Sequence, residues 1–450
     1  MSALILFLIF PEVNKVLIIT RSAVDKPSHS PYDEEKVFRR QIMSQYALRG
    51  RVIDAVSDQP IEDGLVVIED ERLAYVGPYD ESKVPQDVEP LAVENGTILP
   101  GFIDCHAHLT GSQDAGSFSR GHLFGDQLLG AAYQCGLLLD AGFTGIRDMS
   151  VAGFYLSRAV ERGVLRGPKI MPGGQVLSNT SGHLDSDMSK TKEEINKDNP
   201  IGLLVDGVDD CVMGVRKQFR MGAKFIKICA TGGVSSPTDR VDDVAFSDAE
   251  FKAIVEETKR HHTYVCAHCT GNEGAYKALQ AGVTCIEHGV MLTQREIDLM
   301  KEMDASLVTT LSVSLGVANI PGLPDWMAKK ARDCAEANKN TIRMAREAGI
   351  RIALGTDYSN SRNSPYLELG REFEAMTRAG MTPMEAIRAG TINAAYLMMS
   401  DHETGSLEAG KLADVVLVDG NPLEDIWCLT HADHVKAVFM NGKMEKNTIA

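Results

Sequence analysis

The sequence lacks a long apolar run. Its most apolar stretch, ALILFLIF near the N-terminus, is too short to span a bilayer. No basic residue precedes that stretch, so it also makes a poor secretion signal. Residues 21–45 are polar and contain proline, and we therefore expect residues 1–45 to form a poorly ordered N-terminal extension.

Basic residues are also in deficit. The chain has 46 Lys and Arg against 62 Asp and Glu, a formal net charge of −16. This acidic balance argues against nucleic acid and against a membrane surface as partners.

The cysteine pattern gives little sign of disulfides. The nine cysteines are an odd number, and several of them, such as Cys105 and Cys229, lie in apolar runs. We expect reduced, buried thiols and a cytoplasmic protein. Cys266 and Cys269 form a CxxC, for which a redox or zinc role is an alternative, but no second CxxC supports zinc.

Both ends of the chain have the residue pattern of β-strands. Residues 46–98 and 403–446 contain short Val- and Ile-rich segments separated by turn residues: ALRGRVIDA, GLVVIEDERLAYVG, KLADVVLVDGNPL and HVKAVFMNGKM. Neither piece is large enough for a domain. We expect the two to pair into one small β-sandwich.

Residues 99–402 alternate between strand and helix signals. Eight apolar runs read as strands: ILPGFIDCHAH, TGIRDM, PKIMPGGQVLS, AKFIKICATGG, YVCAHC, TCIEHG, ASLVTTLSV and RIALGTD. Eight such units predict an α/β fold of the (β/α)8 TIM-barrel type. Capping boxes at Ser247–Glu250, Thr293–Glu296 and Thr382–Glu385 mark three of the helix starts.

Residues suited to metal binding end several of these runs. His106 and His108 are two positions apart on a strand, so both side chains point to one face. Imidazole pairs of this kind suit Zn, Mn, Co or Fe. Because the strands of a barrel end on one rim, six residues are expected to meet there. They are His106, His108, Lys227, His268, His288 and Asp357.

Lys227 lies between the apolar neighbours Ile226 and Ile228. An unpaired buried ammonium is costly, which favours the neutral amine. A neutral amine can form a Schiff base, or react with CO2 to give a carbamate that bridges two cations. A lysine in a structural salt bridge is the alternative. His268 or His288 taken alone could equally be a core histidine, whereas together, at matching strand ends, they point to ligation.

The motifs together resemble those of the binuclear metal-dependent amidohydrolase superfamily. Within it, the segments PGFIDCHAHL, TGIRDM, GQVLSNTSGHLD, FIKICATGGVSSPTD, AHCTG, CIEHG and GTDYS are similar to the branch of Xaa-Pro and Xaa-Arg dipeptidases, metal-dependent carboxypeptidases and ochratoxinase-like amidases. The resemblance covers about residues 46–446. It implies hydrolysis of the amide bond to a C-terminal amino acid in a dipeptide, N-acyl amino acid or ochratoxin-like amide, and assembly into a homo-oligomer.

The resemblance also implies roles for the six residues. His106, His108 and Asp357 would hold one divalent ion, zinc being the expected metal, and His268 and His288 a second. A carbamate on Lys227 would bridge the ions, and a hydroxide between them would attack the carbonyl. Asp357 would be the catalytic residue that takes the proton.

Substrate binding is expected from His183 and Arg147. His183 in SGHLD is a candidate donor to the substrate's carboxylate, with an exposed loop histidine as the alternative. Arg147 ends a strand and is a second candidate, although an internal pair with Asp148 is an equal alternative. Some relatives place a tyrosine near Phe246, so a phenol donor is missing here.

Three other functions remain open at this point. A mononuclear deaminase or imidazolonepropionase-like enzyme needs no bridging lysine, so Lys227 argues against it. A non-enzymatic scaffold would be expected to have lost ligands, whereas all six are present. A Schiff-base lyase would use Lys227 but leave the four histidines unexplained.

Overall fold

The computed structural model describes residues 6–9, 16–19, 44–110, 124–185, 187–317, 324–359 and 364–449. It forms two units, Met1–Met43 and Ser44–Ala450. In the first unit, β1 (Leu6–Ile9) pairs antiparallel with β2 (Val16–Ile19). Of the remaining residues of the expected N-terminal extension, only 44 and 45 are described, and Gln45 already begins β3. Across the described part of the chain, no helix is both long and apolar enough to cross a membrane.

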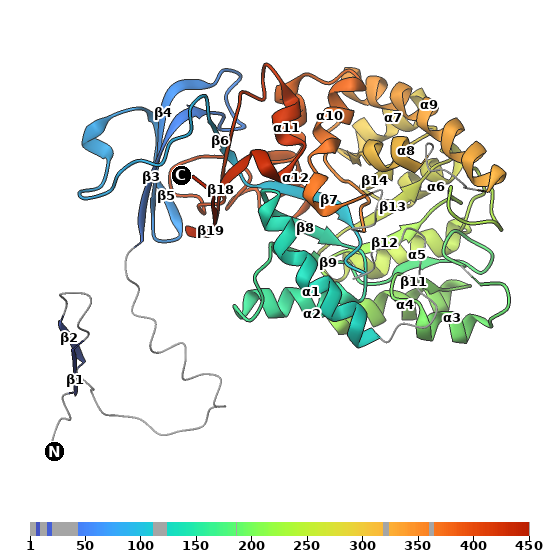
Figure 1. Cartoon of the computed structure of the whole chain (residues 1–450). Coiled ribbons are helices and arrows are strands. Elements are labelled where there is room, and N and C mark those ends of the chain that lie inside the picture. Colours follow the sequence, from blue (N-terminus) through green and yellow to red (C-terminus); the bar gives the residue numbers. More distant parts are fainter. Residues whose placement is uncertain are drawn as a thin grey trace. The chain divides into compact units, whose positions relative to one another are not determined.

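The two ends of the second unit contribute to one seven-stranded sheet, ordered β19-β18-β17-β6-β3-β4-β5 (Figure 1). The junction between the ends is the antiparallel pair of β17 with β6. Leu48, Val66 and Phe439 belong to one apolar cluster of the sheet, and Ala47 and Leu65 to another. Where the sequence suggested a sandwich, hydrogen bonding gives one sheet. Its strands are β3 (Gln45–Val52), β4 (Ile61–Glu69), β5 (Arg72–Pro78), β6 (Thr97–Pro100), β17 (Val415–Val418), β18 (Val435–Met440) and β19 (Lys443–Asn447).

The middle of the chain forms two parallel sheets. One contains three strands in the order β7-β8-β9, and the other seven in the order β11-β10-β12-β13-β14-β15-β16. Their bounds are β7 (Phe102–Ala107), β8 (Phe143–Asp148), β9 (Lys169–Pro172), β10 (Val176–Ser178), β11 (Gly202–Leu204), β12 (Ile226–Cys229), β13 (Val265–Cys269), β14 (Cys285–His288), β15 (Ser306–Val308) and β16 (Ile352–Ala353). Backbone hydrogen bonds join the sheets at both sides, from Lys224 N to Pro172 O and from Cys105 N to Leu354 O.

Three of the predicted strands differ in detail. The run ILPGFIDCHAH is split at Gly101 into β6, in the sheet of the chain ends, and β7, in a parallel sheet. The run PKIMPGGQVLS is split into β9 and β10 by Gly173 and Gly174. A Cβ on Gly173 would overlap the Phe225 ring, and Gly174 has a φ of 76°, so both positions require glycine. The run ASLVTTLSV leaves the strand after Val308, because buried Glu372 accepts hydrogen bonds from two backbone N–H groups that open a helix at Leu311.

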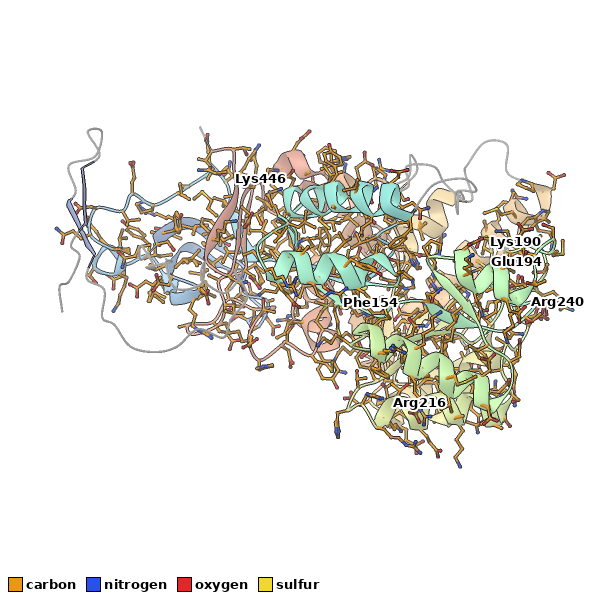
Figure 2. The ribbon with its side chains drawn as sticks, turned by 90° about the horizontal axis from the view of Figure 1, so that it is seen from below. Phe154, Lys190, Glu194, Arg216, Arg240 and Lys446 are labelled. Carbon is orange, nitrogen blue, oxygen red and sulfur yellow. The ribbon has the colours of Figure 1, made fainter. Side chains whose placement is uncertain are left out.

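Helices alternate with the parallel strands, and three of them, α1, α2 and α4, are prominent in Figure 2, with Phe154 on α2 and Arg216 on α4 labelled. All three predicted capping boxes are present, and Thr191 with Glu194 forms a fourth. The helices are α1 (Phe124–Asp140), α2 (Ala152–Glu161), α3 (Lys192–Asp198), α4 (Val208–Met221), α5 (Asp248–Lys259), α6 (Asn272–Ala281), α7 (Gln294–Glu302), α8 (Leu311–Val317), α9 (Asp325–Ala348), α10 (Arg371–Arg378), α11 (Pro383–Ala389) and α12 (Ile392–Leu397).

Candidate metal and substrate site

Three of the predicted metal ligands form a compact group. The ligand atoms of His106, His288 and Asp357 all lie within 4.8 Å of one another. His108 joins them through Asp357, whose Oδ1 is 3.1 Å from His108 Nε2 and 3.5 Å from His106 Nε2. The strands β7 and β14 and the segment after β16 therefore deliver these side chains to one place, as the sequence predicted for strand ends.

His268 extends the group on the β13 side. Its ring centroid is 4.5 Å from that of His288, which in turn is 4.8 Å from that of His106. His288 and Asp357 both adopt the left-handed backbone conformation, with φ of 67° and 59°. This conformation costs energy for a residue with a Cβ, and its presence at two neighbouring candidate ligands is typical of a functional site.

Lys227 lies within the same group. Its side chain is buried, with Nζ 3.4 Å from His106 Nε2 and 3.5 Å from Met149 Sδ. No ion pair to this lysine is found among the described residues, so the salt-bridge alternative has no support there. An amine buried beside four imidazoles is positioned for chemistry with a cation site.

His106 is oriented by a carboxylate that sequence reasoning missed. Its Nδ1 is 2.7 Å from Oε2 of Glu287, which is fully buried on β14. Burial raises the pKa of Glu287, but the charges of Arg147 and Lys227 lower it overall, so Glu287 is a carboxylate that accepts the Nδ1 proton. His106 Nε2 is then free to bind a cation. The feature of the sequence that could have revealed Glu287 is its charge inside the otherwise apolar run CIEHG.

The other three histidines are also held through one ring nitrogen each. The contacts are His108 Nδ1 with Met149 O at 3.0 Å, His268 Nε2 with Gly232 O at 3.2 Å, and His288 Nδ1 with Thr310 Oγ1 at 2.7 Å. A contact to a carbonyl fixes the proton on that nitrogen. The opposite nitrogen of His268 therefore keeps its lone pair for a metal, whereas His108 Nε2 lies 3.1 Å from Asp357 Oδ1.

The electrostatics of the group favour cation binding. Burial lowers the pKa of His106, His268 and His288, so these imidazoles are neutral. Burial also acts to lower the pKa of His108, but its hydrogen bond to Asp357 raises it overall. For Asp357, burial opposes ionisation, yet the neighbouring His106 and His108 hold its pKa below the usual range.

Arg147 does not line a substrate pocket, which corrects its predicted role in substrate binding. It is fully buried, and its donors are occupied by Glu287 Oε1 at 2.6 Å, Cys105 O at 2.6 Å and Tyr264 OH at 2.9 Å. The alternative pair with Asp148 is also wrong, because that carboxylate accepts from the backbone N–H groups of Leu109 and Ser150.

His183 is brought to the site as the sequence suggested. Its ring stacks on His268, with centroids 4.5 Å apart and planes at 21°. The side chain is 12% exposed, so the exposed-loop alternative is excluded. Phe246 is buried and packs edge-on against Phe251, so this position offers no polar group.

The cysteines are buried and free of disulfides, as predicted. Burial raises the pKa of Cys266 and Cys269 above its usual range, so both are protonated thiols. They pack as small core side chains beside His268.

The model of the amidohydrolase family matches residues 97–444. The chain belongs to the amidohydrolase family. It is a hydrolytic enzyme that acts on C–N bonds, in a family that generally uses divalent metal ions. The donor set here fits such ions, because neutral imidazoles and an ionised carboxylate converge within 4.8 Å.

The names of several similar proteins describe related hydrolytic activities. Ochratoxinase from Aspergillus niger is 33% identical over 410 residues, covering 86% of this chain and 84% of that protein. A prolidase solved with N-methylphosphonate-L-proline is 30% identical with a TM-score of 0.82, covering 90% of this chain and all of that chain. A Xaa-Pro dipeptidase with bound methionine is 29% identical with a TM-score of 0.80, covering 89% and 99%.

Proposed function

We propose that this enzyme hydrolyses the amide bond to a C-terminal amino acid, in dipeptides, N-acyl amino acids or ochratoxin-like amides. The observation that carries the proposal is Lys227, buried without an ion-pair partner in the described residues, with Nζ 3.4 Å from His106 Nε2 and within the histidine group. The ochratoxinase, the prolidase and the Xaa-Pro dipeptidase among its relatives support the substrate class.

Two divalent metals, with zinc as the expected ion, would occupy the site. His106, His108 and Asp357 would hold one metal, His268 and His288 the other, and Lys227 as a carbamate would contact both. When bound, such ions supply Lewis acidity and a nucleophile at neutral pH. The short distances from Asp357 Oδ1 to both His106 and His108 support the first part of this assignment.

The protein's own residues would then handle protons and orientation. Asp357, ionised and 29% exposed, would take the proton of the attacking water and pass it to the leaving amine. Glu287 would hold the His106 ring in position, and His183 would donate to the substrate's free carboxylate.

The same proposal includes the finer architecture. The hydrogen bonds that join the two parallel sheets at both sides support a closed (β/α)8 barrel. A homo-oligomer is proposed on the resemblance alone.

Metal content measured together with hydrolysis tests this function. The enzyme purified in bicarbonate buffer would be assayed against N-acyl amino acids and Xaa-Pro, Xaa-Arg and Xaa-Phe dipeptides. About two metals per chain, as expected for a binuclear site, with release of the C-terminal amino acid is the expected result. About one metal and no release would overturn it. That outcome would favour the alternative of a mononuclear deaminase or imidazolonepropionase-like enzyme.

A further inference from the structure

Lys330 on α9 is anchored in a ring of oxygen atoms. Its ammonium donates to the backbone carbonyls of Gly233 at 3.0 Å, Ser236 at 2.9 Å and Asp239 at 2.6 Å. It also lies 3.2 Å from Asp239 Oδ1, and its side chain is only 19% exposed. A single cation therefore fixes the path of the loop that follows β12.

The same loop holds His183. Ser236 Oγ donates to Asp239 Oδ1, and His183 Nδ1 is 3.2 Å from Ser236 Oγ and 3.5 Å from Asp239 Oδ2. A Cβ on Gly233 would overlap the His183 ring, so the backbone of Gly233 lies directly against it. On the other side the ring stacks on His268. The His183 ring is thus in contact with both the loop and the candidate ligand His268. The arrangement of Lys330, Asp239, Ser236 and His183 is called the clamp below.

The clamp connects three separate parts of the chain. His183 comes from the segment after β10, Asp239 from the loop after β12, and Lys330 from α9. Figure 2 shows Lys190 and Glu194 of the first segment and Arg240 of the second at the end of the molecule away from Lys446 of β19. The stacking of His183 on His268 places the contacts between these segments beside a candidate metal ligand.

The hydrogen bonds also set the direction of the imidazole. With its hydrogen donated to Asp239 Oδ1, Ser236 Oγ accepts from His183 Nδ1–H. His183 Nε2 has no hydrogen-bond partner among the described residues. In the imidazolium form, in which both ring nitrogens are donors, Nε2–H can be donated to a substrate carboxylate. Burial raises the pKa of Asp239, but its hydrogen bonds with His183, Ser236 and Lys330 lower it overall, so it is a carboxylate.

We propose that Lys330 is a positioning residue that fixes the β12 loop, and through Asp239 and Ser236 fixes His183 to receive the free carboxylate of the substrate. That the substrate has a free carboxylate rests on the proposed function. The contacts of the clamp do not depend on the proposed function. Lys330 acts through His183, so its effect should appear as selectivity for substrates with a free carboxylate.

Lys330→Met tests this role, with Lys329→Met as the matched control. Lys329 is the preceding residue, but its side chain is 77% exposed, and among the described residues its ion pair is with Asp333. We expect Lys330→Met to lower kcat/KM about tenfold for an N-acyl amino acid, mainly through KM, because a charge-assisted hydrogen bond is lost. Hydrolysis of the corresponding C-terminal amide should be nearly unchanged, Lys330→Arg should restore part of the preference, and Lys329→Met should match the wild type.

The double variant His183→Ala/Lys330→Met separates positioning from general damage. If Lys330 acts through His183, the double variant should have the kcat/KM of His183→Ala alone. Equal losses for the acid and the amide, or additive losses in the double variant, would overturn the proposal.

Ring NMR of 15N-labelled histidine gives a readout that needs no activity. The His183 signal, assigned from its absence in His183→Ala, should shift in Lys330→Met and stay in place in Lys329→Met. An unchanged signal in Lys330→Met would refute the clamp even in an active enzyme. A shifted signal in a protein that hydrolyses no amide would instead refute the proposed function and leave the clamp standing.

Discussion

Replacing Glu287 by glutamine should weaken both the fold and the metal site. Glu287 and Arg147 are both fully buried and are 2.6 Å apart, while the second oxygen of Glu287 accepts from His106. Glu287→Gln keeps the size of the side chain but removes its charge, which leaves the Arg147 guanidinium buried without a counter-ion. The amide also has only one acceptor oxygen for the three donors His106, Arg147 and Cys285.

The size of the effect follows from these contacts. Removing one partner of a buried ion pair costs about 3–5 kcal/mol. Because Arg147 keeps its bonds to Cys105 O and Tyr264 OH, we expect the lower end, about 3 kcal/mol of unfolding free energy. Loss of the partner that orients a metal-binding histidine costs about 10–100-fold in metal affinity or activity.

Urea unfolding, metal titration and hydrolysis measured on the same variants check both effects. Glu256→Gln is the control, since Glu256 is 59% exposed and pairs only weakly with Lys252 at 3.8 Å. The double variant Arg147→Met/Glu287→Gln removes both charges and should regain most of the stability. It should regain only part of the metal affinity, because the amide oxygen freed from Arg147 is a neutral and therefore weaker acceptor for His106 than the carboxylate. Wild-type stability in Glu287→Gln, or full metal affinity in the double variant, would refute the reasoning.

Three further substitutions are predicted. Asp357→Asn should keep the fold and lower kcat by about 100-fold or more, because an amide cannot take the proton. Lys227→Ala should lose metal and activity, and a short carboxylic acid should restore part of both if it replaces a carbamate. Glu372→Gln should flatten the pH dependence of stability. Burial raises the pKa of Glu372, so the wild type should lose unfolding free energy relative to the variant as pH rises from about 4.3, the usual value for glutamate, through the raised pKa.

Each of these predictions has a result that contradicts it. Full activity of Asp357→Asn would exclude Asp357 as the proton acceptor. Unchanged metal content in Lys227→Ala would exclude a bridging role for that lysine. A difference in unfolding free energy between wild type and Glu372→Gln that stays constant from pH 4 to pH 8 would show that Glu372 does not titrate differently in the folded and unfolded states.

The sequence alone was sufficient for most of the alternating strands and helices and for the residues that meet as candidate ligands, but it did not predict β11 (Gly202–Leu204). Apolar runs that end in His, Lys or Asp are local signals, and parallel strands place their ends on one side. The capping boxes at Ser247, Thr293 and Thr382 were predictable for the same reason, since a cap depends on residues three positions apart. Family membership followed from the same motifs.

Only the tertiary structure decided how those ligands are oriented. Arg147 could line a pocket or form a buried ion pair. Glu287, which lies 140 positions away on a different strand, decides between the two by pairing with it. The ammonium of Lys330 is likewise 97 positions from Gly233, and no periodicity relates the two. Hydrogen-bond partners of this kind are set by the packing of whole strands and helices, so a local pattern can supply the chemical groups but not the contacts between them.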